Sequence, residues 1–88
     1  MLIRSQNKDM LFDYQNAYID RVGACLYFNP YSIDMTNSGI CLGCYSTEEK
    51  ALKVLDYISN AYAECQAKYG GMVEYKYLVF EMPQEEEI

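Results

Sequence analysis

Residues 46–71 read STEEKALKVLDYISNAYAECQAKYGG, and this stretch decides the fold. Its apolar residues recur every three or four positions and so share one helical face: Ala51, Leu55, Ile58, Tyr62, Cys65 and Tyr69. Ser46 is a favourable N-cap, and Glu49 three positions later completes a capping box. The glycines at 70–71 end the helix because glycine readily adopts the left-handed conformation. We therefore predict one long helix over about residues 47–69.

The segments on both sides of this helix have the patterns of β-strands. Before the helix, runs of apolar residues bounded by turn signals predict strands at residues 1–6, 24–28 and 40–45. Gly43 indicates a bulge or a close approach of another chain. After the helix, residues 72–82 first alternate and then become apolar on both parities. That pattern predicts a strand that lies centrally, under the helix.

Two segments between these strands are less regular. Residues 10–21 place Phe12, Tyr14 and Tyr18 on one strand parity, which favours a strand, whereas a short helix is the alternative. Residues 30–39 form a long, turn-rich connection. Connections of that length in a small domain are often functional.

The order of these elements predicts an α+β fold. We expect a small antiparallel or mixed sheet of about four to five strands, with the long helix packed across one face. A chain of 88 residues has room for a single domain, which we place at residues 1–83. Residues 84–88 include three glutamates and are expected to form a frayed acidic tail.

The composition favours a binding protein over an enzyme. The chain has no histidine, which removes the commonest general base and the usual partner of a nucleophilic serine or cysteine. Glu74 and Glu81 form a conceivable acid–base pair, but both occupy strand positions expected to face solvent. We expect no catalytic residue and no cofactor, and an enzyme remains the outside alternative.

The net charge of −6 argues against direct binding of nucleic acid, which needs a basic surface. An acidic surface suits a basic protein partner, although solubility alone is the simpler explanation. No run approaches the roughly 20 apolar residues of a membrane helix. Residues 1–6 also lack the pattern of a signal peptide. We therefore expect a soluble, cytoplasmic protein that does not contact a membrane.

The four cysteines occupy positions 25, 41, 44 and 65. A cytoplasmic location predicts that all four stay reduced. Cys41 and Cys44 have the CxxC spacing of zinc sites and redox enzymes. Inside a regular strand, however, their side chains would point to opposite faces. We therefore expect no metal site and interpret the cysteines as small hydrophobic residues.

Ten tyrosines are the most unusual feature of the composition, and some should lie on an exposed binding surface. The candidate anchors are Tyr14, Tyr18, Tyr27 and Tyr31. The acidic groups that would replace phosphates against a basic protein are Asp9, Asp13, Asp20 and Asp34. For an anionic ligand, Arg4 and Arg21 carry the only guanidinium groups. Surface salt bridges are the simpler role for both arginines.

Three stretches, at residues 1–6 (MLIRSQ), 42–56 (LGCYSTEEKALKVLD) and 80–86 (FEMPQEE), resemble a group of short proteins of Firmicutes and their phages and prophages. Those proteins begin with an Ile-Arg-Ser-Gln strand, carry a Leu-Gly-x-Tyr-x-Thr-x-Glu helix start and close on x-Met-Pro. The resemblance covers about a third of the chain. It implies a mobile-element origin and no particular activity, and it places specificity in the segments that do not match.

This resemblance, with the small size, acidity and excess of tyrosine, leads to three hypotheses. The first is a phage-type counter-defence protein that binds and inhibits a basic host immune factor, such as a CRISPR–Cas effector. The second is a sponge that sequesters a cyclic-nucleotide or ADP-ribose signal, with a site at the interface of a homo-oligomer. The third is a protein-interaction module without an inhibitory role.

Overall fold

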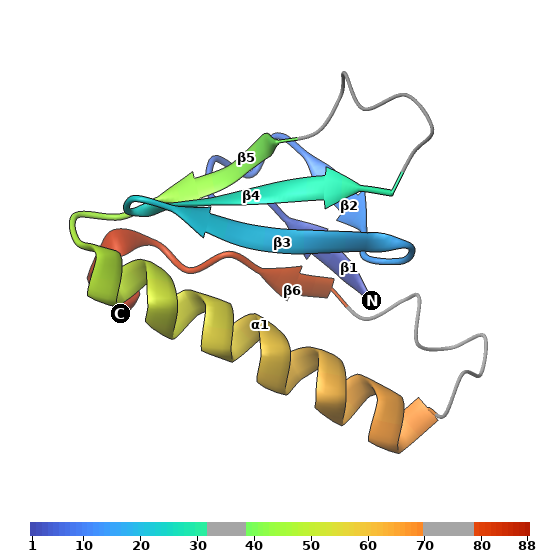
Figure 1. The fold of residues 1–88 in the computed structure, drawn as a ribbon. Coiled ribbons are helices and arrows are strands. Elements are labelled where there is room, and N and C mark those ends of the chain that lie inside the picture. The colour runs from blue at the N-terminus through green and yellow to red at the C-terminus, as the bar shows by residue number, and fades with distance from the viewer. Residues whose placement is uncertain (32–38, 70–78) are drawn as a thin grey trace.

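The computed structural model describes residues 1–31, 39–69 and 79–88 and confirms the α+β class (Figure 1). The described elements, in chain order, are β1 (Leu2–Arg4), β2 (Leu11–Asp13), β3 (Ala17–Val22), β4 (Cys25–Pro30), β5 (Ile40–Cys44), α1 (Glu48–Tyr69), β6 (Val79–Glu81) and the 3₁₀ helix η3 (Glu85–Glu87). Residues 10–21 thus contain two strands, as favoured. The predicted glycine cap at 70–71, residues 72–78 of the last strand and most of the 30–39 connection lie outside the described residues.

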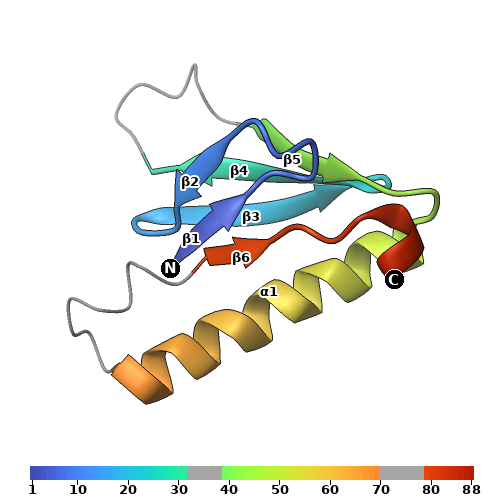
Figure 2. The ribbon, with the colours of Figure 1, turned by 180° about the vertical axis from the view of Figure 1, so that it is seen from behind.

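The six described strands form two sheets, where the sequence predicted one sheet of four to five strands. β3, β4 and β5 form an antiparallel sheet in that order. The other sheet is mixed and has the order β2-β1-β6, with β1 antiparallel to β2 and parallel to β6 (Figure 2). The prediction of a central last strand is wrong, because the described part of β6 lies at the edge of its sheet and β1 is central.

The hydrophobic core lies where the two sheets and α1 meet (Figures 1 and 2). The buried strand residues are Ile3 from β1, Leu26 and Phe28 from β4, and Leu42 from β5, and partly buried residues of β2, β3 and β6 pack against them. The rings of Phe12 on β2 and Phe28 on β4 lie 4.8 Å apart and join the two sheets. The helix buries Ala51, Val54, Ile58 and Cys65. Of the predicted apolar stripe, Ala51, Ile58 and Cys65 are buried, whereas Tyr62 is 37% exposed and the stripe omitted buried Val54.

The helix begins one residue later than the predicted N-cap implies. Thr47, not Ser46, caps the helix, because the Lys50 N–H donates to the Thr47 hydroxyl over 3.1 Å. Ser46 is engaged elsewhere: its hydroxyl and its N–H both donate to the carboxylate of Glu85. The prediction of Ser46 as N-cap is therefore wrong, although Glu48 and Glu49 do occupy the first turn.

The C-terminal segment is docked, so the expectation of a frayed tail is wrong. Glu85 forms an ion pair with Lys50 on α1 in addition to its bonds with Ser46. The Gln84 side chain donates to the carbonyl of Gln6 over 2.8 Å, and Ile88 packs against the core. Residues 84–88 therefore link the start of α1 to the loop that follows β1.

A β-bulge in β5 changes which side chains share a face. The strand register steps from Leu26↔Gly43 to Tyr27↔Cys41, so Leu42 has no partner of its own on β4. A Cβ atom at Gly43 would lie 2.8 Å from the Cβ of Gln6, so only glycine fits at this position. The interpretation of Gly43 as a bulge is correct, and the residue that approaches it closely is Gln6 of the same chain, not another chain.

Candidate functional site

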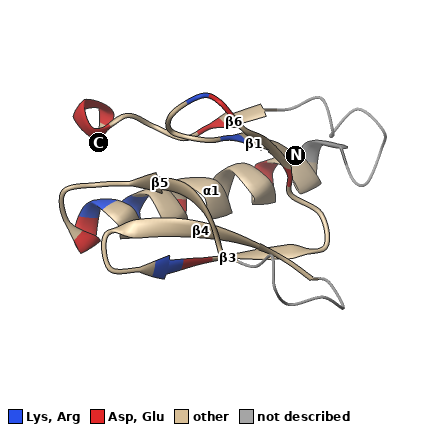
Figure 3. Cartoon of the chain, turned by 90° about the horizontal axis from the view of Figure 1, so that it is seen from above, with Lys and Arg blue, Asp and Glu red and all other residues tan. Residues whose placement is uncertain are grey.

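The face of the β3-β4-β5 sheet that points away from the core is here termed the outer face. Side chains alternate along a strand, and Leu26 and Phe28 of β4 are buried on the inner side. The β4 residues that alternate with Leu26 and Phe28 therefore lie on the outer face, together with the β3 and β5 residues that pair with them. This set is Tyr18, Asp20, Val22, Cys25, Tyr27, Asn29, Cys41 and Cys44. Neither β4 nor β5 carries a charged residue (Figure 3).

Three of the four predicted tyrosine anchors gather at the outer face. The Tyr18 side chain is 43% exposed and Tyr31 is 60% exposed, and their ring centroids lie 5.3 Å apart. Tyr27 lies on the same face, half-buried and opposite Asp20. Val22, which is 60% exposed, extends the apolar surface along β3. Rigid aromatic rings exposed in this way supply contact area at a low entropic cost.

A buried amide orders the middle of this face. Asn29 is buried, and its side-chain NH₂ group donates to the Asp20 carboxylate over 2.9 Å and to the Tyr27 carbonyl over 3.2 Å. These bonds hold Asp20 against the sheet. Asp20 is the one predicted phosphate-mimicking residue that the described part of the chain places on the outer face.

The other predicted partner-binding residues lie elsewhere. Tyr14 packs between Phe28 and Tyr62. Burial raises the pKa of the Tyr14 hydroxyl, and the electrostatic effect of Tyr62 is the second cause of this rise. Asp9 belongs to the turn between β1 and β2, and Asp13 ends β2 in the other sheet. Asp34 lies outside the described residues. Strand parity alone could not separate Tyr14 from Tyr18, because the chain changes sheet between them.

The two arginines do not converge on one site. Arg4 lies on β1, where its guanidinium group donates to the Lys8 carbonyl and pairs with Glu81 at 3.4 Å. Arg21 lies on β3, donates to the Gly23 carbonyl over 2.8 Å and lies 3.8 Å from the Glu48 carboxylate. Both groups are thus engaged with protein atoms of different sheets. Glu81 serves as a surface ion-pair partner, and Glu74 lies outside the described residues.

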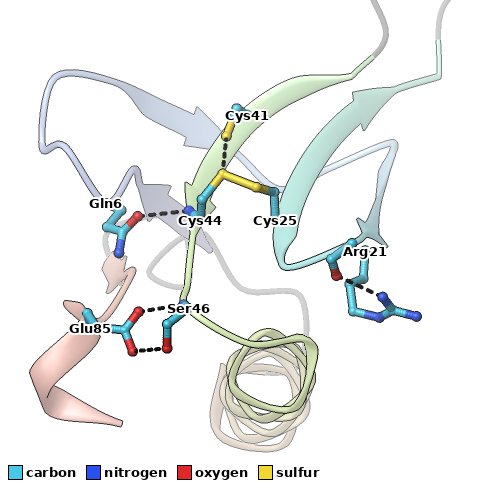
Figure 4. The surroundings of a disulfide bond; sticks show 8 residues. Gln6, Arg21, Cys25, Cys41, Cys44, Ser46 and Glu85 are labelled. Atoms are coloured by element: carbon cyan, nitrogen blue, oxygen red, sulfur yellow. Dashed lines mark hydrogen bonds between the residues drawn. A yellow bond between two sulfur atoms is a disulfide. The ribbon is translucent and has the colours of Figure 1, made fainter.

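Three sulfur atoms form a cluster on the outer face that the sequence did not predict (Figure 4). Cys25 and Cys44 are joined by a disulfide, and their Cα atoms lie 4.0 Å apart because the two residues are direct partners in the β4–β5 register. The Cys41 thiol is exposed, with its sulfur 3.7 Å from that of Cys44. The expectation that all cysteines are reduced is wrong, because Cys25 and Cys44 are oxidised, whereas exposed Cys41 and buried Cys65 form no disulfide.

The bulge is the reason that sequence reasoning missed this cluster. In a regular strand, positions 41 and 44 would face opposite sides of the sheet. Because Leu42 is an extra residue in β5, the alternation of side chains shifts by one position, and Cys41 and Cys44 face the same side. Gly43 was the available signal, since glycine inside a strand often marks a bulge. In the residues that the structure describes, no three His, Cys, Asp or Glu side chains are grouped as metal ligands.

Within the described ranges, no helix has the length and apolar character needed to span a membrane. Comparison of the chain with protein-family models, with curated proteins and with solved structures finds no match. The assignment of a role therefore rests on the residues of the outer face and on their surroundings.

Proposed function

We propose that this chain is a small, non-enzymatic binding protein that holds a protein partner on its outer face. The observation that carries the proposal is the exposed pair Tyr18 and Tyr31, whose rings are in contact beside two strands without charges. Desolvation of aromatic rings and uncharged strand surface costs little, whereas burial of charges is expensive. A partner that covers these rings would therefore gain contact area, and the Asp20 carboxylate on this face already accepts a hydrogen bond from Asn29.

The resemblance to phage and prophage proteins supplies the setting of this proposal. The partner would be a host immune factor of the bacterial cytosol, inhibited because the bound chain occupies its working surface. A CRISPR–Cas effector is one such factor, and the net charge of −6 favours encounter with a basic protein. The nucleotide-sponge alternative receives less support, since Arg4 and Arg21 are engaged on separate sheets.

Phage plating on bacterial strains that each carry one defence system tests the proposal. Expression of the chain should restore plaques in one of these strains. The double variant Tyr18→Ala/Tyr31→Ala should lose this effect. Tyr57→Ala is the matched control, because Tyr57 is also 43% exposed but lies on α1. It should inhibit as the unmodified chain does.

The outcomes separate the two parts of the proposal. If the chain restores plaques in no strain, the inhibitory role is wrong and an interaction module becomes the better description. If the double variant inhibits as well as Tyr57→Ala does, the inhibitory role stands but the outer face is not its surface. Circular dichroism of each purified variant shows whether a loss of inhibition reflects a loss of folding.

A further inference from the structure

The sulfur cluster places a thiol beside a disulfide. The Sγ atom of exposed Cys41 lies 3.7 Å from the Sγ atom of Cys44, which is bonded to Cys25 (Figure 4). A disulfide is exchanged when a thiolate attacks one of its sulfur atoms and the other sulfur leaves. The nucleophile, the attacked sulfur and the leaving sulfur of such a reaction are therefore all present within one sheet.

The bulge makes a second disulfide geometrically accessible. Cys41 and Cys44 pair with Tyr27 and Cys25, which are two positions apart on β4. The Cα atoms of Cys41 and Cys44 are therefore separated by about 7 Å, the two-residue rise of a strand, which is near the upper limit that a disulfide spans. A hollow of about 330 Å³, lined in part by Met10 and Gln6, adjoins both cysteines and gives the Cys41 side chain room to rotate.

We propose that Cys25, Cys41 and Cys44 form a thiol–disulfide exchange site, in which the disulfide moves from Cys25–Cys44 to Cys41–Cys44. The Cys41 thiol gives its proton to solvent, and the thiolate attacks the Cys44 sulfur. The Cys41–Cys44 bond forms as the Cys25–Cys44 bond breaks, and Cys25 leaves as a thiolate that takes up a proton. One thiol and one disulfide exist before and after, so the step needs no oxidant or reductant.

The exchange changes how the sheet is held together. The Cys25–Cys44 bond links β4 to β5, whereas a Cys41–Cys44 bond lies within β5 and leaves the two strands joined by hydrogen bonds alone. The released Cys25 thiol would lie on the same face as Tyr27. The outer face thus exists in two covalent forms. This inference stands on the sulfur geometry and does not depend on the proposed partner.

Cyanogen bromide cleavage distinguishes the two forms, because Met35 lies between Cys25 and the other two cysteines of the cluster. The oxidised protein is held at neutral pH, quenched in acid and cleaved in formic acid without a reductant. Mass spectrometry then examines fragments 11–35 and 36–72. The Cys25–Cys44 form gives these two fragments joined. The exchanged form gives them apart, with fragment 36–72 lighter by the two hydrogens that its internal disulfide lacks.

The unmodified protein should yield both products, and Cys41→Ser should lose the separated, internally oxidised product completely. Cys65→Ala is the matched control and should yield both, which shows that Cys65 plays no part. Joined fragments alone at every incubation time would overturn the exchange. Separate fragments that carry only thiols would overturn it as well, because the starting disulfide would be absent.

A second variant tests whether Cys41 and Cys44 can form a disulfide with each other. Cys25→Ser removes the leaving sulfur, so oxidation with glutathione disulfide should close Cys41–Cys44 directly and remove two hydrogens from fragment 36–72. Failure to close this bond, while circular dichroism shows a folded protein, would overturn the proposal. None of these measurements involves a binding partner, so their failure leaves the proposed function standing, and the plating assay leaves the exchange standing.

Discussion

The carboxylate of Glu85 accepts two hydrogen bonds from Ser46, one from the backbone N–H over 2.7 Å and one from the hydroxyl over 3.0 Å. Together with the ion pair to Lys50, these bonds fasten the C-terminal segment to the start of α1. The pKa of Glu85 is held below its ordinary value of 4.5, mainly by the hydrogen bond from Lys50 and further by the bonds from Ser46.

Glu85→Gln should lower the melting temperature at neutral pH, because the neutral amide cannot replace a carboxylate opposite Lys50. A folded-state pKa below the unfolded value means that this stabilisation is complete above about pH 4.5 and is lost as the pH falls through the folded pKa. Thermal denaturation from neutral to acidic pH should therefore show the two proteins converging. Glu86→Gln, at an exposed neighbouring position, is the control. A constant difference at all pH values would contradict this account.

Gly43→Ala should destabilise the fold by about 1–3 kcal/mol, the usual cost of overpacking. The added Cβ would lie 2.8 Å from the Cβ of Gln6 and 2.9 Å from its Oε1. Gln6→Gly removes both of these atoms, so Gly43→Ala should cost less in that background. Urea unfolding of the two single variants and the double variant gives the coupling. Equal costs in both backgrounds would show that the clash with Gln6 is not the cause.

Tyr45→Phe should destabilise the protein by about 1 kcal/mol, because the buried hydroxyl donates to the Pro83 carbonyl over 2.8 Å. Burial is the main cause, and the nearby Glu85 charge the second, that raises the pKa of Tyr45 to about 12. The unfolded chain loses this proton near pH 10, so the stability of the unmodified protein should fall between about pH 10 and 12. Tyr45→Phe should lack this part of the fall in alkaline melting curves. Parallel curves would refute the assignment.

Tyr18→Ala and Tyr31→Ala should each weaken partner binding by about 2 kcal/mol. Each variant also removes the ring contact between Tyr18 and Tyr31, which should destabilise the free protein by about 0.5–1.5 kcal/mol and leave it folded. Calorimetric titration against the partner found in the plating assay measures the change. Unaltered affinity in both variants would place the binding surface elsewhere.

Salt should lower that affinity only modestly, through weaker attraction between the acidic chain and a basic partner, because uncharged strands and tyrosines dominate the outer face itself. The same titration at two salt concentrations provides the measurement. A steep loss of affinity at high salt would instead favour mimicry of phosphates by exposed carboxylates such as Asp9 and Asp13.

Local sequence patterns predicted where the helix and the strands lie better than they predicted the contacts between these elements. The periodicity of residues 46–71 located α1, since the spacing of apolar side chains is a property of the helix itself. The engagement of Ser46 by Glu85 could not be predicted, because the two residues meet only through tertiary structure. The docked C-terminus escaped prediction for the same reason: acidity indicates exposure unless a basic partner such as Lys50 is known to lie nearby.

The candidate site shows the same division between local and tertiary information. The abundance of tyrosine indicated an exposed aromatic surface, and Tyr18, Tyr27 and Tyr31 do lie together. The sulfur cluster depends on a one-residue shift in the pairing of β5, which reverses the parity between Cys41 and Cys44. Gly43 indicated an irregularity at this point, but the position of the extra residue, and the contact of Gln6 with Gly43, are set by tertiary structure.

The parallel pairing of β1 with β6 has a consequence for the chain as it is synthesised. β1 is made early, yet its partners Val79, Phe80 and Glu81 follow only after the other five strands and helix α1 described here. The β3-β4-β5 sheet, in contrast, has all three strands once residue 44 has emerged. Neighbouring segments pair sooner than distant ones. The outer face can therefore assemble first on the growing chain, while completion of the other sheet requires the segment that follows α1.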